Sequence, residues 1–141
     1  LERLISMHLI LLQITIPLLL GLFHLIGPVP ADLGADGGHL SPCESPAHCA
    51  SATWRVSDSA AALRQLSQTV ENTPRAEIVQ QSNNYLHATY SSRIFGFVDD
   101  LELVASDDVT VEARSISRLG ESDLGVNAQR LASLERSLES Q

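Results

Sequence analysis

A long uncharged stretch at the N-terminus constrains this chain more than any other feature. Residues 4–26 read LISMHLILLQITIPLLLGLFHLI and contain no Asp, Glu, Lys or Arg. At a rise of about 1.5 Å per residue, a helix of this length spans a hydrocarbon core of about 30 Å. The sequence GPVP that follows would end such a helix. The pattern therefore predicts one transmembrane helix, serving as a membrane anchor, within residues 1–27.

A cleaved signal peptide is the alternative interpretation of this stretch. Residues 29–31 loosely fit the small-x-small pattern for cleavage after Ala31, but a secretory apolar region usually has only about 7–15 residues. Arg3 precedes the stretch and acidic residues follow it, so the N-terminus is expected on the cytoplasmic side. Under either interpretation, the rest of the chain is expected on the periplasmic side of the membrane.

The length and charge of the chain exclude several function classes. With 141 residues, the chain has room for one small folded domain. Its formal net charge is -8, and all of its basic residues are arginines. A nucleic-acid binder needs clustered basic residues, and a P-loop or a Schiff base needs a lysine, so we expect neither nucleic-acid binding nor these chemistries.

Residues 28–53 are rich in Gly, Pro and Ser and predict a linker. They contain both cysteines of the chain, Cys43 and Cys49. In an exported protein a disulfide between them is the default expectation. A zinc site that also uses His39 and His48 is one alternative, and a free redox-active pair is another. Because no predicted strand or helix would hold zinc ligands in place here, we expect the disulfide and no metal or other cofactor.

Residues 54–141 predict one folded domain with the element order α-β-β-β-β-α. Ser57 or Asp58 can cap a first helix that ends near Val70. Alternating apolar residues then predict strands over 75–81, 85–91, about 95–105 and 109–117, and a last helix over 123–138. The fold class we expect is α+β: the transmembrane helix, then a small antiparallel four-stranded sheet with helices on one face.

The second predicted hairpin allows an argument about register. If residues 106–108 form its loop, Leu103 faces Val111 and Leu101 faces Ala113, which places every apolar pair on one face. A shift by one residue would oppose apolar and charged side chains. The parity of the two strands is therefore well determined.

This register separates two neighbouring acids. Asp99 falls on the apolar face opposite Ser115, whereas Asp100 falls on the other face, opposite Arg114, where we expect exposure to solvent. An inward carboxylate must be paired, because an unpaired buried charge costs several kcal/mol. Asn127, on the buried side of the last helix, is expected beside Asp99. The candidate binding or structural network comprises Asp99, Asp100, Arg114, Ser115, Ser117, Arg118, Asp123, Asn127 and Arg130.

Two interpretations of this network remain open. It could be a hydrogen-bond network that fixes how the last helix packs, or it could be a pocket for a small polar ligand or a partner. The arginines near Gly120 and Gly125 could hold a carboxylate or phosphate at the start of the last helix, where backbone N–H groups favour anions. The acidic neighbours Glu121 and Asp123 argue against an anion there.

Three motifs resemble a known family. Residues 114–130, RSISRLGESDLGVNAQR, resemble the RSxSRxGxSDxGxNxxR signature of the domain-of-unknown-function family 1499. Residues 97–100 resemble its FxDD segment, and residues 43–51 are similar to its CPxSPNCVSS opening, with His48 and Ala50 in place of Asn and Val. The resemblance covers residues 42–138. It implies an exported or plastid protein, located in the periplasm or, in a phototroph, in the thylakoid lumen.

We expect a non-catalytic function. The chain has no GxSxG, HExxH or GxGxxG motif, and His87 is the only histidine in residues 54–141. We therefore assign no catalytic residue and expect a membrane-anchored, exported accessory or assembly protein that binds another membrane protein or complex. A module that handles a small polar ligand or a lipid is the first alternative, and a small hydrolytic enzyme is the second.

Overall fold

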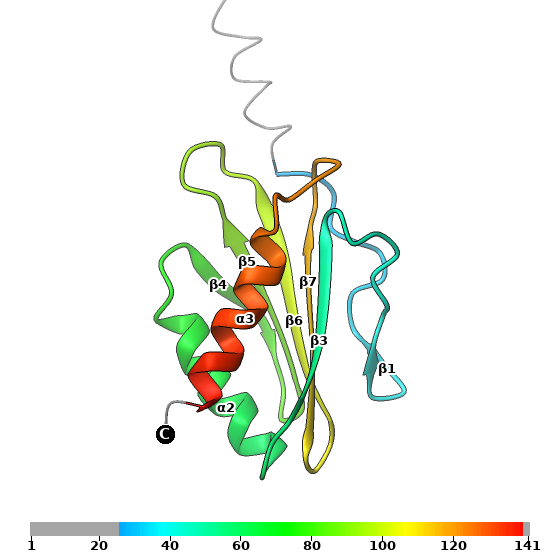
Figure 1. The fold of residues 1–141 in the computed structure, drawn as a ribbon, viewed down its shortest axis with the longest axis vertical. Helices are drawn as coiled ribbons and strands as arrows, with labels where there is room; N and C mark the ends of the chain where they lie inside the picture. Colours follow the sequence, from blue (N-terminus) through cyan, green and yellow to red (C-terminus); the bar gives the residue numbers. More distant parts are fainter. Residues whose placement is uncertain (1–25, 140–141) are drawn as a thin grey trace, which may run out of the picture.

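A five-stranded antiparallel sheet forms the centre of the computed structural model, which describes residues 26–139 (Figure 1). The strand order is β3-β7-β6-β5-β4. These strands are β3 (Cys49–Arg55), β4 (Ala76–Gln81), β5 (Tyr85–Ser91), β6 (Val98–Asp107) and β7 (Thr110–Ser117). The helices are α2 (Ser59–Glu71) and α3 (Val126–Glu139), and a separate small hairpin consists of β1 (Ala35–Asp36) and β2 (His39–Leu40).

The sheet contains a strand that the sequence did not predict. Strands β4 to β7 correspond to the four predicted strands, but β3 begins within the predicted linker 28–53. Its apolar signal is weak because Ala50 and Ala52 are small; only Trp54 adds a large apolar side chain on that face. Antiparallel pairing with β7 along its whole length makes it a strand. The prediction of a four-stranded sheet is wrong.

The predicted transmembrane helix lies almost entirely in residues 1–25, outside the described residues. Within residues 26–139, no helix is long and apolar enough to cross a bilayer. The expected fold class, a membrane helix followed by a four-stranded domain, is therefore corrected to an α+β domain with a five-stranded sheet, a two-stranded hairpin and two helices.

Helix α2 begins and packs as its sequence predicts. The carboxylate of Asp58 accepts a hydrogen bond from the backbone N–H of Ala61 at 2.9 Å, which satisfies one of the free donors of the first turn. Its apolar side chains recur at helical spacing and are buried against the sheet. They are Ala62, Leu63, Leu66 and Val70.

The sheet has a different layer on each face. Helices α2 and α3 cover one face, and residues 26–48, which we call the strap, run over the other (Figure 1). Along β6, Leu101 and Leu103 belong to the core under the helices, whereas Asp100 and Glu102 point to the strap. The strap is the reason why the second face is buried.

The β6–β7 hairpin keeps the predicted faces but has different partners. Leu103 pairs with Ala113 and Leu101 pairs with Ser115, two positions from the predicted register. The turn is shorter than expected, because Asp107 already pairs with Thr110 and accepts a hydrogen bond from the Val109 N–H at 2.8 Å. A shift by two residues leaves each side chain on its predicted face, since the strand period is two.

Candidate functional site

A polar cluster lies where the start of α3 packs on β6 and β7. We call it the helix-face cluster, and its members are Asp99, Ser115, Ser117, Asn127 and Arg130. Strand alternation places Asp99 on β6 and the two serines on β7 on the face that α3 covers. The sequence predicted that Asp99, Ser115 and Asn127 would lie near each other, and the structure brings them together.

Asn127 is the centre of the helix-face cluster. Its amide oxygen accepts a hydrogen bond from Ser115 Oγ at 2.7 Å. Its amide nitrogen donates to Ser117 Oγ at 2.9 Å and to the carbonyl oxygen of His48 at 3.1 Å. The side chain is fully buried, so these bonds replace the hydration it has lost. Asn127 thereby joins α3 to β7 and to His48 at the end of the strap.

Arg130 supplies the positive charge of the helix-face cluster. Its Nη1 donates to Asn127 Oδ1 at 2.6 Å and to Ser115 Oγ at 2.7 Å, and its Nη2 donates to Asp99 Oδ2 at 2.7 Å. The guanidinium carbon also lies 4.3 Å from the centre of the Tyr90 ring, within the range of a cation–π contact. The partner of Asp99 is therefore Arg130, and Arg118 lies elsewhere.

Asp123 caps the start of α3. Its carboxylate accepts hydrogen bonds from the backbone N–H groups of Gly125 at 2.8 Å and Asn127 at 3.0 Å. Burial by itself would raise the pKa of Asp123, but these hydrogen bonds outweigh burial and lower it below its ordinary value. The amides suggested as an anion site thus already bind a carboxylate of the same chain.

A second cluster lies between the sheet and the strap, and we call it the strap-face cluster. Its members on the sheet are Tyr85, His87, Asp100, Glu102, Arg114 and Arg118, and Asp32 joins it from the strap. These side chains come from three adjacent strands and from the residue after β7. The signature residues Arg114 and Arg118 thus lie on the opposite face from Ser115 and Ser117.

Asp100 is a carboxylate of the strap-face cluster with three side-chain contacts, which come from Arg118 and His87. Arg118 donates from Nε to Oδ2 at 2.7 Å and from Nη2 to Oδ1 at 2.8 Å, and His87 Nε2 lies 2.8 Å from Oδ1. Burial alone would raise the pKa of Asp100, but the hydrogen bonds from Arg118 and His87 lower it overall. The two-pronged contact with Arg118 is the strong form of an arginine–carboxylate pair.

Two predictions about Asp100 are wrong. It is fully buried rather than exposed, and it pairs with Ile116 across the ladder rather than with Arg114. The exposure was mispredicted because residues 28–53 were taken as a free linker, whereas the strap covers this face. The partner was mispredicted because the turn between β6 and β7 is shorter than expected and because β6 has a bulge between Ala105 and Asp107.

Glu102 connects the sheet to the strap. This buried carboxylate accepts hydrogen bonds from Tyr85 Oη at 2.7 Å, from the Gly34 N–H at 2.6 Å and from Arg114 Nη1 at 3.1 Å. Arg114 Nη2 in turn donates to Asp32 Oδ2 in the strap at 2.6 Å. Burial, followed by the hydrogen bond to Glu102, raises the pKa of Tyr85 well above its ordinary value, so the phenol stays protonated and remains a donor.

The predicted disulfide joins Cys43 of the strap to Cys49, the first residue of β3, and is confirmed. Because the chain has only these two cysteines, no thiolate is left for the zinc alternative. His39, one of its suggested ligands, instead lies with Nδ1 2.7 Å from Glu112 Oε1 on β7. The disulfide and this contact hold the two ends of the β2-to-β3 connection against the sheet.

Tyr85, His87 and Glu102 also belong to this buried site, although they were not predicted as its members. Their signal was present, because they alternate with the apolar residues of β5 and β6 and so share a face with Asp100 and Arg114. The same alternation is typical of a strand that exposes its polar face to solvent. Only the position of the strap distinguishes these two cases.

The fold and its two clusters define a small disulfide-linked α+β domain in which charged side chains attach a strap and a helix to opposite faces of one sheet. Residues 39–138 match the model of a family described as Protein of unknown function (DUF1499), and the chain belongs to this family. The resemblance found in the three motifs is thereby confirmed. No curated protein and no solved structure matches the chain.

Proposed function

We propose that this chain is an exported accessory or assembly protein whose folded domain binds a partner membrane complex. The observation that carries the proposal is the use of the signature side chains. Arg114, Arg118 and Arg130 are each paired with a carboxylate of the same chain, so the signature builds a rigid scaffold. A scaffold of this kind serves function by presenting its loops and edges to another molecule.

The compartment in this proposal is supported by the disulfide and by the apolar N-terminal sequence. Disulfides persist in oxidising compartments such as the periplasm, and the Cys43–Cys49 bond closes the strap onto β3. The uncharged residues 4–26 support delivery of the domain to a membrane or across it. The negative net charge of -8 argues against nucleic acid as the partner.

The His87–Asp100 pair favours a structural function over hydrolysis. A histidine oriented by a carboxylate is a component of hydrolytic sites. Here, however, Asp100 is shared with Arg118 in a two-pronged contact, and only 8% of the His87 side chain is exposed. A base closed off in this way cannot readily reach a substrate in solution, so the pair stabilises the strap-face cluster instead.

A hollow of about 540 Å³ offers room for a small ligand, but it lies away from the family signature. It is bounded by residues of the end of β3, the start of α2 and the end of α3, including Trp54, Gln65 and Glu135. None of the residues in the helix-face or strap-face cluster lines it. Because the signature residues build a different part of the molecule, partner binding is favoured over ligand binding.

Cross-linking and purification test the proposed function. The full-length chain would be tagged, cross-linked in its own membranes and purified in mild detergent, beside a chain that lacks residues 1–30. An accessory protein is expected to yield a membrane protein in near-stoichiometric amount from the full chain and to lose it after the deletion. Retention of a small molecule by both chains, with no protein partner, would instead establish the ligand-binding alternative.

A further inference from the structure

Large apolar side chains are exposed on two loops at one end of the sheet. The first loop, residues 92–97, joins β5 to β6, and the second, residues 118–125, joins β7 to α3. Ile94 is 81% exposed, Phe95 58% and Leu124 88%. Figure 1 shows both loops at the end of the molecule opposite the β6–β7 turn. We call this surface the apolar tip, and its residues are Ile26, Ile94, Phe95, Phe97 and Leu124.

The first loop of the apolar tip has a defined structure. The Ser92 N–H donates to the Phe97 carbonyl at 2.8 Å, and the Phe97 N–H donates to Ser92 Oγ at 2.9 Å. The rings of Phe95 and Phe97 have centroids 5.6 Å apart. The two loops are also joined at their bases, because the Arg118 N–H donates to the Val98 carbonyl at 3.0 Å. The exposed rings are therefore held on a closed turn.

Leu124 in the second loop is exposed at a backbone position that disfavours leucine. Its φ is 53°, in the left-handed region that glycine occupies most readily. With 88% of its surface exposed, the side chain gains almost nothing from burial in the folded domain. Neither its conformation nor its exposure stabilises the fold, so its apolar side chain is available to contact something outside the domain.

The apolar N-terminal sequence enters the domain at this same tip. Ile26 is the first described residue. The next residue, Gly27, packs closely on the loop that follows β7, where a Cβ on Gly27 would lie 2.7 Å from Leu119 Cγ. Residues 4–26 carry no charge. The uncharged sequence of residues 4–26 therefore ends at Ile26, which is itself a residue of the apolar tip.

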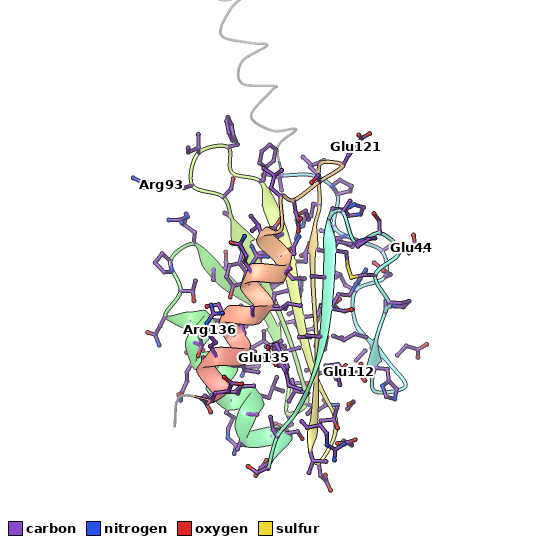
Figure 2. The ribbon with its side chains drawn as sticks, viewed as in Figure 1. Glu44, Arg93, Glu112, Glu121, Glu135 and Arg136 are labelled. Atoms are coloured by element: carbon purple, nitrogen blue, oxygen red, sulfur yellow. A yellow bond between two sulfur atoms is a disulfide. The ribbon has the colours of Figure 1, made fainter. Side chains whose placement is uncertain are left out.

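We propose that the apolar tip inserts into the interfacial region of a lipid bilayer. The proposal deepens the proposed function and rests on its membrane location. Phenylalanine and leucine are typical of protein surfaces that enter the boundary between headgroups and acyl chains. Arg93 and Glu121 lie at the rim of this end and carry opposite charges, and the chain as a whole is negative (Figure 2). The tip therefore offers no net positive charge to an anionic headgroup, so the proposal commits to a zwitterionic lipid, with apolar burial supplying the affinity.

Insertion of the tip also defines how the domain stands on the membrane. The strands of the sheet run from the tip to the β6–β7 turn, so this turn points away from the bilayer (Figure 1). The helices and the strap then lie at the sides of the domain. Both remain accessible to a partner protein in the same membrane, which agrees with the proposed function.

Tryptophan quenching by lipid tests this inference with a matched pair of variants of the full-length chain. Phe95→Trp places a reporter on the tip, and Val79→Trp places one on β4, where the native side chain is 57% exposed, close to the 58% of Phe95. The native Trp54 is buried and pairs with Val111 near the far turn, so it supplies a constant background. The vesicles contain phosphatidylcholine brominated near the top of its acyl chains.

We expect both variants to float with the vesicles. For Phe95→Trp we expect the added tryptophan to lose about half of its fluorescence, because interfacial side chains lie about 5–10 Å deep and so come close to the bromine atoms. The Val79→Trp variant is expected to be quenched no more than the parent chain. Equal quenching of the two variants, or failure of the full chain to float, would overturn the inference.

The alternative occupant of the tip is a second copy of this chain. If the chain self-associates in sedimentation, Phe95→Ser abolishes this self-association and lipid does not quench Phe95→Trp, the tip is a contact between two copies instead. Loss of quenching leaves the partner co-purification unaffected, so the two proposals fail separately.

Discussion

The two faces of the sheet are buried in different ways. Under α2 and α3, burial is mainly apolar, with Leu66, Leu101 and Leu103 fully enclosed, and the helix-face cluster lies at the start of α3. Under the strap, burial is mainly electrostatic, with Asp100 and Glu102 fully enclosed and paired with arginines. A strap with two-residue strands offers little apolar surface, and it is held by hydrogen bonds to these charges.

The domain is therefore expected to be more sensitive to substitutions on the strap face than on the helix face. Apolar burial is distributed over many contacts, so removal of one polar partner at its margin has a limited effect. A buried charge depends on its few partners, and loss of one leaves the others uncompensated. The two adjacent acids of β6 allow a direct comparison of the two faces, because Asp99 points to the helices and Asp100 points to the strap.

The largest effect is expected for Asp100→Ala. The substitution leaves Arg118 and His87 without their carboxylate beneath the strap, and removal of one partner from a buried charged set costs about 3–5 kcal/mol. Urea unfolding followed by circular dichroism would measure the free energy of unfolding. Asp108→Ala, at an exposed turn position, is the matched control and should change it little. Equal destabilisation by the two substitutions would show that the contacts of Asp100 in the strap-face cluster do not add to the free energy of unfolding.

Acid is expected to destabilise the strap face next. The folded-state pKa of Asp100 lies below its ordinary value of 3.8, so its contribution is complete above that pH and is lost as pH falls through the lowered pKa. The carboxyl pKa of Glu112, which contacts His39 in the strap, is also lowered, although burial alone would raise it. Melting temperatures measured between about pH 6 and pH 2 should therefore fall below about pH 4.

The acid prediction has an internal control in Asp100→Asn. This variant has no carboxylate to take up a proton at position 100, so its melting temperature should be lower at neutral pH and should fall less steeply in acid than that of the parent chain. Parallel pH profiles for the two proteins would exclude Asp100 as the source of the acid sensitivity.

Reduction of the disulfide is expected to have a smaller effect. The Cys43–Cys49 bond closes a loop with a sequence separation of 6, for which chain-entropy reasoning gives a stabilisation of about 2 kcal/mol. The hydrogen bonds from Gly34 and Arg114 continue to hold the strap, so the reduced domain should stay folded. Thiol titration should find no free thiol before reduction and two after it, and a thiol in the unreduced protein would contradict the assignment.

The smallest effect is expected for Asp99→Ala on the helix face. Arg130 loses one carboxylate but keeps Ser115, Asn127 and the Tyr90 ring, and the pair is partly accessible to solvent. We expect a decrease of about 1 kcal/mol in the free energy of unfolding, measured beside Asp100→Ala. A larger effect for Asp99→Ala than for Asp100→Ala would reverse the comparison between the two faces.

Local sequence patterns were sufficient to predict most elements of the domain. The capping residue and apolar spacing of α2, the hairpin over residues 76–91 and the parity of β6 and β7 are all confirmed. Each of these features depends on residues close together in sequence, where helical and strand periods determine which side chains share a face. The disulfide was predictable on other grounds, because Cys43 and Cys49 are the only cysteines of a chain expected to be exported.

Tertiary structure alone decided that a fifth strand joins the sheet and that the strap covers its second face. The small residues of β3 carry almost no apolar signal and become a strand by pairing with β7, which follows more than 50 residues later in the chain. The strap becomes a layer of the fold through contacts with Glu102, Glu112 and Arg114 that are equally distant in sequence. Alternation places Asp99 and Asp100 on opposite faces, but it cannot distinguish a polar face in water from one beneath a strap. Burial is a property of the covering layer, and the layer that buries Asp100 is formed by residues far from it in the chain.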